Sequence, residues 1–518
     1  MMTNSRFTAV DLRSLRFNPW LIALTVMLAT FMELLDASVV NIALRHIAGT
    51  FASGPDEATW VLTSYLIANA IVLLATGWLS AFFGRKRLML ASIVIFTVAS
   101  MLCGVAPSLP FLILARVVQG IGGGVLQPSA QAVLLESFPP AKRGHGMCLY
   151  TIGIMVAPLL GPSVGGWITE NWSWRAAFYI NLPVGILALL MTQIFVTDPP
   201  YLQPVRRRVD YVGFALMVVG LGALQIALDR GQQADWLSSA LIRNLIIVAA
   251  LMLGGFIWWQ LRVKNPIVDL RVLKDRNFAI GTLLVTFVSG VVFYATVTLL
   301  PMFLESLMGY TSALSGQTLA ARGIGALIAT IFVGRLIGKI DLRLISGCGI
   351  GLLALSIYLL SVVNLEVAQS AFWWPCFWNG VAFGFISAPL MALAVSTIRN
   401  DKIGYATSIF NALRNLGGSV GISVLTTLLA RREQSNQTIL GPNFTSYNPA
   451  FRGQIQRLQA TLGRQRAYRV LYENLLTQAS LLAFIDQFRT LAIFCLLCAP
   501  LALFFRKTEY REGDLSRR

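Results

Sequence analysis

Apolar segments long enough to cross a lipid bilayer follow one another along almost the whole chain. A helix needs about 20 mainly apolar residues to span the hydrocarbon core, where only helices and closed barrels satisfy every backbone group. We count fourteen such segments, at residues 20–44, 58–81, 88–105, 111–136, 145–169, 176–197, 210–229, 239–262, 277–304, 312–337, 342–363, 371–397, 404–430 and 482–505. With 56% hydrophobic and 12% charged residues, the sequence predicts an all-α polytopic membrane protein.

Basic residues cluster in the loops that follow even-numbered segments. Examples are Arg85 to Arg87, Lys142 with Arg143, and Arg206 to Arg208. Because cytoplasmic loops are enriched in Lys and Arg, we expect both termini to be cytoplasmic. The same clusters account for the net charge of +18, so nucleic-acid binding is not indicated. The first apolar segment is too long for a signal peptide and ends without a small-residue cleavage site, so it is expected to be an uncleaved span.

The loop 431–480 is an exception, because it is basic and yet falls on the outer side. Long loops cross the membrane with less regard to charge. Its stretch 450–475 has apolar residues at helical spacing, for example Ile455, Leu458 and Leu462, which predicts a surface helix. The loop is either a solvated connection or a docking surface for a partner outside the membrane.

Two acidic residues, Glu33 and Asp36, lie in the middle of the first segment. A charge at the bilayer centre costs about 2.5–3.5 kcal/mol, and residues three apart share one helix face. A carboxyl group in a partly dehydrated cavity can exchange protons near neutral pH, so the pair suggests proton-coupled transport. Arg116 is expected within about 5 Å of the depth of Asp36, which permits either a switchable or a permanent ion pair. Glu33 has no obvious partner, which makes it either the proton carrier or a cavity-lining group.

Two arginines, Arg322 and Arg414, lie about one third to one half of the way through segments of the second half. No mid-membrane carboxylate of that half can neutralise them. They either face Glu33 and Asp36 across a central cavity, attract anionic substrates, or pack against backbone carbonyl groups.

Signals of enzymatic chemistry are missing from the sequence. The six cysteines fall in or beside apolar segments, and Cys495 and Cys498 form a CxxC without a nearby His. We therefore expect no metal and no cofactor. No phosphate-binding loop is present either, so transport is expected to be driven by an ion gradient and the protein is not expected to be an enzyme.

An internal repeat appears when the chain is shifted by 260 positions. Gly120 then aligns with Gly380, and Gly161 with Gly421. Both copies cross the membrane in the same direction, which predicts two six-helix bundles related as parallel repeats, with two inserted helices between them. The predicted units are 1–200, 201–272 for the inserted helices, and 273–518, which includes the loop 431–480.

Several motifs carry a resemblance to a known family. They are LDASVVNIAL at 35–44, GWLSAFFGRKRL at 77–88, RVVQG at 116–120, the Gly-Pro segment 153–166, NLPVG at 181–185, LQIALDRGQQADW at 224–236 and RNLGGS at 414–419. Together they resemble the fourteen-span drug:proton antiporters of the major facilitator superfamily, in the EmrB branch of multidrug exporters. Ala81 stands where the superfamily usually has Asp, and Arg45 stands where the branch commonly has Pro.

The resemblance implies a fold, a function and a set of site residues. It implies the major facilitator fold and a proton-coupled antiporter of the inner membrane that exports hydrophobic or amphiphilic toxic compounds. A periplasmic adaptor protein and an outer-membrane channel are implied as partners, besides protons and the lipid bilayer. The expected site residues are Glu33, Asp36 and Arg116 for proton coupling; Asn41, Gln119, Gln127, Arg322, Arg414 and Trp378 for the substrate cavity; and Gly77, Gly84, Arg85, Pro158, Gly161, Pro162, Gly165 and Gly166 for conformational motifs.

Other functions are less consistent with the sequence. A proton-coupled symporter for a small solute is disfavoured by the Gly-Pro segment, which resembles the antiporter motif. A channel is disfavoured by the unequal charges of the two repeats. An exporter dedicated to anionic lipids such as fatty acids remains open because of Arg322.

Overall fold

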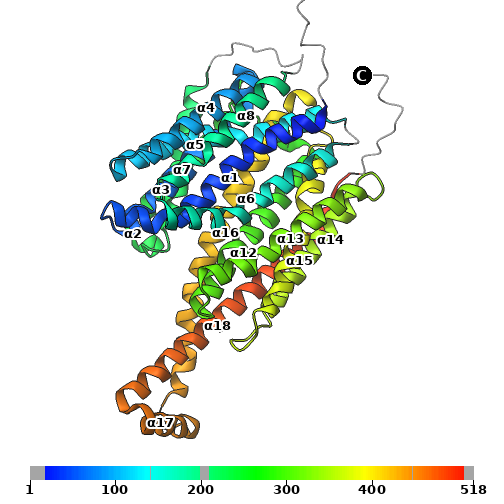
Figure 1. The fold of residues 1–518 in the computed structure, drawn as a ribbon. Coiled ribbons are helices and arrows are strands. Elements are labelled where there is room, and N and C mark those ends of the chain that lie inside the picture. The colour runs from blue at the N-terminus through cyan, green and yellow to red at the C-terminus, as the bar shows by residue number, and fades with distance from the viewer. Residues whose placement is uncertain (1–17, 140–141, 199–208, 446, 507–518) are drawn as a thin grey trace, which may run out of the picture.

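The computed structural model describes residues 18–139, 142–198, 209–445 and 447–506, and these residues are almost entirely helical (Figure 1). The all-α fold expected from the sequence is confirmed. By length and composition, twelve helices within the described ranges can cross a membrane. The predicted fifth and thirteenth segments are also helices but fall outside this set, so the count of fourteen stays a prediction.

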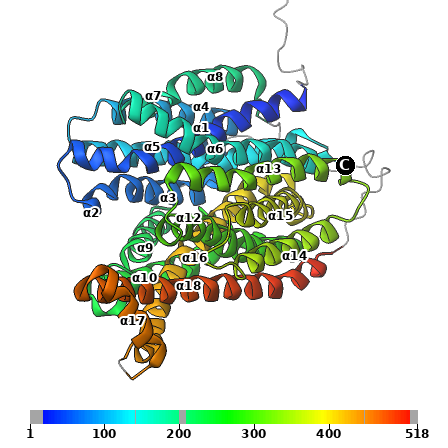
Figure 2. The same ribbon diagram turned by 60° about the horizontal axis from the view of Figure 1, so that its bottom comes forward.

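The helices of the first half pack into one group, coloured blue to cyan in Figures 1 and 2. They are α1 (Pro19–Thr50), α3 (Trp60–Phe83), α4 (Arg85–Gly104), α5 (Leu109–Ser137), α6 (Arg143–Asn171), and α7 (Ala176–Tyr179) followed by α8 (Asn181–Phe195), with the short α2 (Pro55–Ala58) between α1 and α3. Helix α1 packs against α5, α6 and α8, so its polar side chains lie inside this group.

The helices of the second half form a second group below the first in Figure 2. They are the rod made of α11 (Arg276–Leu284), η5 (Val285–Tyr294), α12 (Ala295–Met302) and η6 (Phe303–Leu307), then α13 (Ser312–Leu336), α14 (Leu342–Leu360), α15 (Ser370–Ala394), α16 (Ile403–Leu440) and α18 (Arg464–Cys498). Parts η5 and η6 of the rod are π-helical, a conformation that is rare and frequent at functional sites.

The inserted helices α9 (Tyr211–Arg230) and α10 (Ala240–Arg262) pack on each other. Helix α9 also contacts both halves, through α3 and α16. The hydroxyl of Thr63 donates a hydrogen bond to the carboxylate of Asp229, while Gln225 donates to Ser419 at 3.2 Å. The predicted boundary at residue 200 lies outside the described residues, and the division into three units stays a prediction.

Glycines related by the repeat lie where helices cross at short range. A Cβ atom on Gly120 would lie 2.5 Å from the backbone oxygen of Tyr65 in α3, and one on Gly380 would collide with the backbone oxygen of Arg322 in α13. Because any larger residue would push the helices apart, these positions require glycine. The glycines that repeat in the sequence therefore mark helix crossings that repeat in the structure.

Helices α16 and α18 project beyond the bundle. They contain 38 and 35 residues, or about 57 and 52 Å of helix, against a hydrocarbon core of about 30 Å. Together with α17 (Pro449–Leu462) they form the protrusion at the bottom of Figure 1, which we define as residues 431–480. The single surface helix predicted for 450–475 is wrong: Gly463 has φ of +79°, which ends α17 and starts α18.

Candidate functional site

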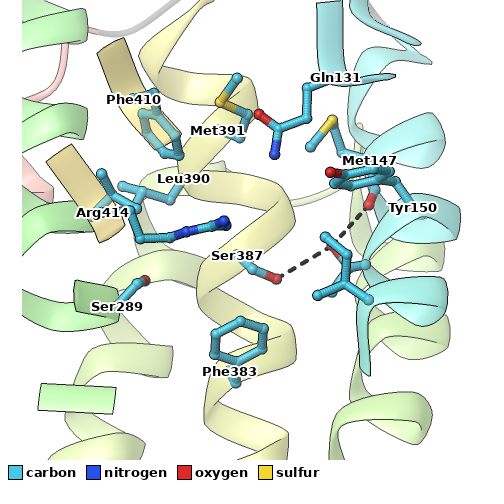
Figure 3. Close-up of a pocket in the computed structure, with 13 residues that line it drawn as sticks. Gln131, Met147, Tyr150, Ser289, Phe383, Ser387, Leu390, Met391, Phe410 and Arg414 are labelled. Atoms are coloured by element: carbon cyan, nitrogen blue, oxygen red, sulfur yellow. Dashed lines mark hydrogen bonds between the residues drawn. The ribbon is translucent and has the colours of Figure 1, made fainter. Parts of the chain in front are cut away.

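A small cavity lies between the two halves (Figure 3). The first half lines it with Gln131, Tyr150 and Thr151, and the second half with Ser387 and Arg414, among other residues. Its volume is about 30 Å³, which is enough for only one or two water molecules. The structure therefore shows the halves pressed together around the centre.

Glu33 lies on α1 and is almost completely buried. Its Oε1 accepts hydrogen bonds from the amides of Asn69, at 3.0 Å, and Gln127, at 3.4 Å. Its Oε2 has no hydrogen-bond partner among the described residues. Glu33 is thus held by neutral donors on one oxygen only, so its environment does not commit it to the ionised form.

Arg414 of α16 reaches across the interface between the halves. Its Nη2 donates to Oε1 of Gln127 at 2.7 Å, and its side chain points into the cavity in Figure 3. The amide of Gln127 therefore contacts Glu33 on one side and Arg414 on the other. Of the two acidic residues of α1, Arg414 is linked to Glu33 through Gln127, whereas Asp36 is bound within its own half.

Asp36 and Arg116 form an ion pair that is closed off from solvent. The Nη1 of Arg116 donates to Oδ2 of Asp36 at 2.7 Å, and both side chains are fully buried. The other carboxylate oxygen accepts from Gln119 at 2.9 Å and from Asn181 at 2.7 Å. The guanidinium also lies over the ring of Tyr65, at 4.2 Å. Every side of this pair is occupied by protein.

The network around Asp36 ties several helices of the first half together. Asn181 of α8 donates to the hydroxyl of Ser100 in α4, at 2.8 Å, and Arg116 donates to the backbone oxygen of Val61 in α3, at 3.1 Å. Helices α1, α3, α4, α5 and α8 are thereby joined within one half. None of these bonds crosses to the second half.

The other residues expected to line a substrate cavity are distributed differently. Gln119 belongs to the Asp36 network, Arg322 is buried beside Phe293, and Asn41 and Trp378 are exposed at the surface of their helices. Within the described ranges, no group of His, Cys, Asp and Glu side chains is placed to hold a metal ion.

The halves meet closely at the end that carries the loop after α3. A Cβ atom on Gly77 would lie 2.7 Å from Cα of Tyr405 in α16. The Nη2 of Arg143 donates to Oδ1 of Asn400 at 3.0 Å. Access to the cavity is therefore closed from this end.

The loop after α3 is anchored by two acidic residues that the sequence analysis did not single out. The buried Arg85 forms an ion pair with Glu136 at the end of α5. Gly84, with φ of +85°, directly precedes the first residue of α4. Asp198 accepts a hydrogen bond of 2.8 Å from the backbone nitrogen of Lys86. In the family that this loop resembles, an Asp usually stands at the position of Ala81. Here Asp198, which follows α8, provides an acid at the start of α4.

The Gly-Pro segment lies on α6, where it packs against α1. A Cβ atom on Gly161 would collide with the side chain of Ser38, and one on Gly165 would lie 3.0 Å from Val39. Gly166 has open space, and Pro158 is exposed. The side chain of Pro162 lies outside the described part of the structure.

Three further polar residues of the site were missed by the sequence analysis. Asn69 binds Glu33, while Asn411 of α16 donates to Oε1 of Gln131 in α5 at 2.6 Å and so joins the halves. All three are buried amides in apolar segments. Because an amide in the membrane must be hydrogen-bonded, its occurrence there was the signal that could have identified them.

A groove runs along the protrusion. It has a volume of about 590 Å³ and is lined by Phe444, Phe451, Tyr468, Leu471 and Tyr472, among others. Tyr468 and Tyr472 are exposed, at 47% and 60%. Several arginines lie near the groove residues in the sequence, so the protrusion combines an apolar groove with positive charge.

Comparison with known proteins gives consistent matches over most of the chain. A sequence profile of the Major Facilitator Superfamily matches residues 26–422. The fatty acid resistance protein FarB of Neisseria gonorrhoeae is 40% identical over 427 residues, which cover 82% of this chain and 84% of that protein. The multidrug export protein EmrB of Escherichia coli strain K12 is 37% identical over 442 residues, which cover 85% of this chain and 86% of EmrB.

Solved structures with the same fold have little sequence in common with this chain. The human organic anion transporter MFSD10 superposes with a TM-score of 0.58 at 12% identity, covering 92% of this chain and 99% of that one. The proton:xylose symporter XylE gives a TM-score of 0.57 at 16% identity, covering 92% and 94%. At these identities the similarity concerns the fold alone.

Proposed function

Because the chain belongs to the major facilitator superfamily, and within it to the branch that contains EmrB and FarB, we propose that it is a proton-coupled antiporter that exports hydrophobic or amphiphilic toxic compounds. The observation that carries this proposal is the position of Glu33. Its buried carboxyl group, held by neutral amides, is linked through Gln127 to Arg414 of the opposite half. A proton on Glu33 therefore acts at the interface where the halves must separate, which suits transport rather than enzymatic chemistry.

The coupling follows from the charges around Gln127. When Glu33 is ionised, its negative charge attracts Arg414 across the shared amide and favours the joined halves. When Glu33 binds a proton, that attraction is lost and the contact between Gln127 and Arg414 is weakened. Proton binding thus favours rearrangement of the two halves, and proton release on the other side restores the contact.

Asp36 and Arg116 have a different role in this scheme. Their ion pair is enclosed within the first half, and both carboxylate oxygens of Asp36 are hydrogen-bonded there. Breaking it would leave buried charges without partners, which is strongly unfavourable. Between the two alternatives stated for the pair, we therefore favour the permanent one, in which Asp36 and Arg116 hold five helices as one rigid unit that moves against the other half.

We place the protein in the inner membrane with both termini in the cytoplasm. The basic loops near Arg85 and Arg143 support this orientation. The end closed by Gly77 and Tyr405 is then the cytoplasmic end, so the structure corresponds to a state that cannot receive substrate from the cytoplasm. The protrusion projects on the periplasmic side.

The protrusion is the candidate contact for a periplasmic adaptor, which would connect the transporter to an outer-membrane channel. Its apolar groove and exposed tyrosines are features of protein interfaces, where aromatic residues are enriched. The protrusion is long enough to hold this groove well outside the hydrocarbon core of the membrane.

A second candidate function is supported by one relative. FarB, which is named for fatty acid resistance, is 40% identical to this chain. An exporter dedicated to anionic lipids such as fatty acids would use the same fold and the same proton coupling, but a narrower substrate site.

The test of the proposal is export from proteoliposomes under an imposed pH gradient. A fluorescent hydrophobic cation and a fatty acid serve as two substrates. Gradient-dependent movement of either one supports the antiporter, and movement of the fatty acid alone supports the second candidate. If neither substrate moves in response to the gradient, the proposal is wrong.

A further inference from the structure

Arg322 is a buried cation with no acidic partner in the part of the chain that the structure describes. It lies on α13 with 9% of its surface exposed, and its Nε and Nη2 have no hydrogen-bond partner among the described residues. The ring of Phe293 lies 5.7 Å from the guanidinium of Arg322 and is part of its apolar surroundings. A charge buried in this way is strongly unfavourable unless something binds it.

The glycine contacts of the two halves place Arg322 at the position of a neutral residue of the first half, Tyr65. There, Gly120 lies against the backbone oxygen of Tyr65, whose ring lies 4.2 Å from the guanidinium of Arg116. In the second half, Gly380 lies against the backbone oxygen of Arg322. Arg322 therefore occupies the place of Tyr65, next to the position where the first half has its ion pair.

The counterparts of that ion pair are neutral. The repeat pairs Arg116 with Cys376, which lies one helical turn before Gly380, the residue that packs against the backbone of Arg322. Asp36 lies two residues before Ser38, the residue that faces Gly161. Its counterpart lies two residues before Val291, which faces Gly421. That counterpart is Ser289.

The second half thus has a cation at the position of Tyr65 and no carboxylate at the position of Asp36. In the first half the charges of Asp36 and Arg116 cancel, whereas the corresponding residues of the second half, Ser289 and Cys376, do not supply a full negative charge. Arg322 therefore has no counter-ion at the positions that form the ion pair in the first half.

Aromatic side chains connect Arg322 to the central cavity. The ring of Phe293 packs on that of Phe383, with 4.2 Å between centroids, and Phe383 lines the cavity in Figure 3. A ligand that reached Arg322 from the cavity would have to pass these rings, so its body must be apolar. A cationic ligand would be repelled by Arg322.

We propose that Arg322 binds the anionic headgroup of an amphiphilic substrate, whose apolar body lies against Phe293 and Phe383. The substrate supplies in the second half the negative charge that Asp36 supplies in the first. That the bound molecule is transported rests on the function proposed above, whereas the binding itself does not. The site therefore selects carboxylate-bearing amphiphiles over cationic ones with the same chain.

The first experiment measures ligand binding to the full-length protein in lipid nanodiscs by calorimetry. The ligands are decanoate, decyltrimethylammonium with the same chain, and acetate as the headgroup alone. We expect Arg322→Gln to weaken decanoate binding about tenfold or more and Arg322→Lys to retain part of it, with decyltrimethylammonium binding unchanged or strengthened. Equal losses for both long-chain ligands, or unchanged decanoate binding, would overturn the proposal, as would acetate binding as tightly as decanoate.

A second variant tests the proposal even if Arg322→Gln does not fold. Cys376→Asp supplies an internal carboxylate at the position that corresponds to Arg116, and we expect it to compete with decanoate and weaken its binding about tenfold. The neutral variant Cys376→Ser is the matched control and should bind like the wild type. If Cys376→Asp binds decanoate as tightly as Cys376→Ser does, Arg322 is not the anion site.

Failure of the proposed function is recognised separately. Wild-type proteoliposomes that move neither long-chain ligand under a pH gradient would refute the antiporter. The binding measurements would still decide whether Arg322 holds the anion.

Discussion

Glu33 and Arg414 lie on opposite halves of the protein and are joined by a single amide. Gln127 donates from its nitrogen to the carboxylate of Glu33 and accepts on its oxygen from the guanidinium of Arg414, 2.7 Å away. The amide is neutral, and its nitrogen and its oxygen are both hydrogen-bonded. A change in the charge of Glu33 therefore affects the contact between Gln127 and Arg414, which joins the halves. In the proposed mechanism, this link couples protonation of Glu33 to the packing of the two halves.

The substitution Glu33→Gln should abolish proton coupling and leave the fold intact. Glutamine keeps an oxygen that accepts from Asn69 and Gln127 but cannot release a proton. We expect export driven by a pH gradient to fall about tenfold or more, equivalent to at least 1.4 kcal/mol in the barrier. The measurement is dye export from proteoliposomes, with the exposed Glu170→Gln as the control. Export at the wild-type rate would show that Glu33 does not carry the proton.

The charges of Glu33 and Arg414 should be energetically coupled. Because both contact Gln127, the effects of Glu33→Gln and Arg414→Gln on the export rate should not add. Neighbours of this kind show interaction energies of about 0.5–3 kcal/mol in double-mutant cycles. Arg414→Gln combined with Glu170→Gln is the matched cycle and should be additive. Additivity of the first pair would mean that the shared amide transmits nothing.

Asp36→Asn should destabilise the protein. The substitution leaves the fully buried guanidinium of Arg116 without its counter-ion, which costs about 3–5 kcal/mol in comparable buried pairs. The measurement is the thermal unfolding of the purified protein in detergent. Glu473→Gln breaks the exposed pair with Arg469 and should change the melting temperature little. A stable Asp36→Asn protein with lost proton coupling would instead support the switchable ion pair.

Gly77→Ala should prevent full closure of the end that carries Arg85. The added methyl group would lie 2.7 Å from the backbone of Tyr405, and overpacking of this kind costs about 1–3 kcal/mol. Spin labels at the exposed positions 87 and 399, with the exposed Cys348 replaced by Ser, report the distance between the halves. We expect longer distances to become populated. Gly254→Ala, where the methyl group meets open space, should keep the wild-type distribution.

Substitutions in the groove of the protrusion should separate transport from resistance. Tyr468→Ala together with Tyr472→Ala removes two exposed aromatic side chains that line the groove, far from the cavity. We expect export from proteoliposomes to remain and the drug resistance of whole cells to fall several-fold, because in the proposed function only the cell needs the adaptor. The exposed Trp172→Ala is the control. Equal resistance of both variants would mean that the groove binds no partner.

Much of the fold was predictable because the membrane restricts what each segment can do. Apolar length locates the helices to within a few residues in most cases, as for the segment 239–262 and helix α10 (Ala240–Arg262). The depths of Asp36 and Arg116 permitted a contact because both follow from counting along a helix. The major facilitator fold itself is confirmed by the comparisons.

The details of the site were harder to predict from the sequence because they depend on which sides of the helices face one another. Depth alone does not distinguish Gln119, which points into the first half, from Gln127, which points across the interface. Likewise, the acids that bind the loop after α3 come from elsewhere: Glu136 from α5 and Asp198 from beyond α8. In the protrusion, apolar spacing continued through Gly463, so the spacing concealed the helix break.

The position of α9 affects how a hydrophobic compound could enter the protein sideways. Helix α9 is hydrogen-bonded to α3 through Thr63 and to α16 through Ser419, so it covers the line along which these two helices meet. The corresponding line between α6 and α13 is not covered by the inserted helices in the described part of the chain. A molecule dissolved in the surrounding lipid therefore meets two unequal flanks of the transporter, one covered by α9 and the other formed by α6 and α13.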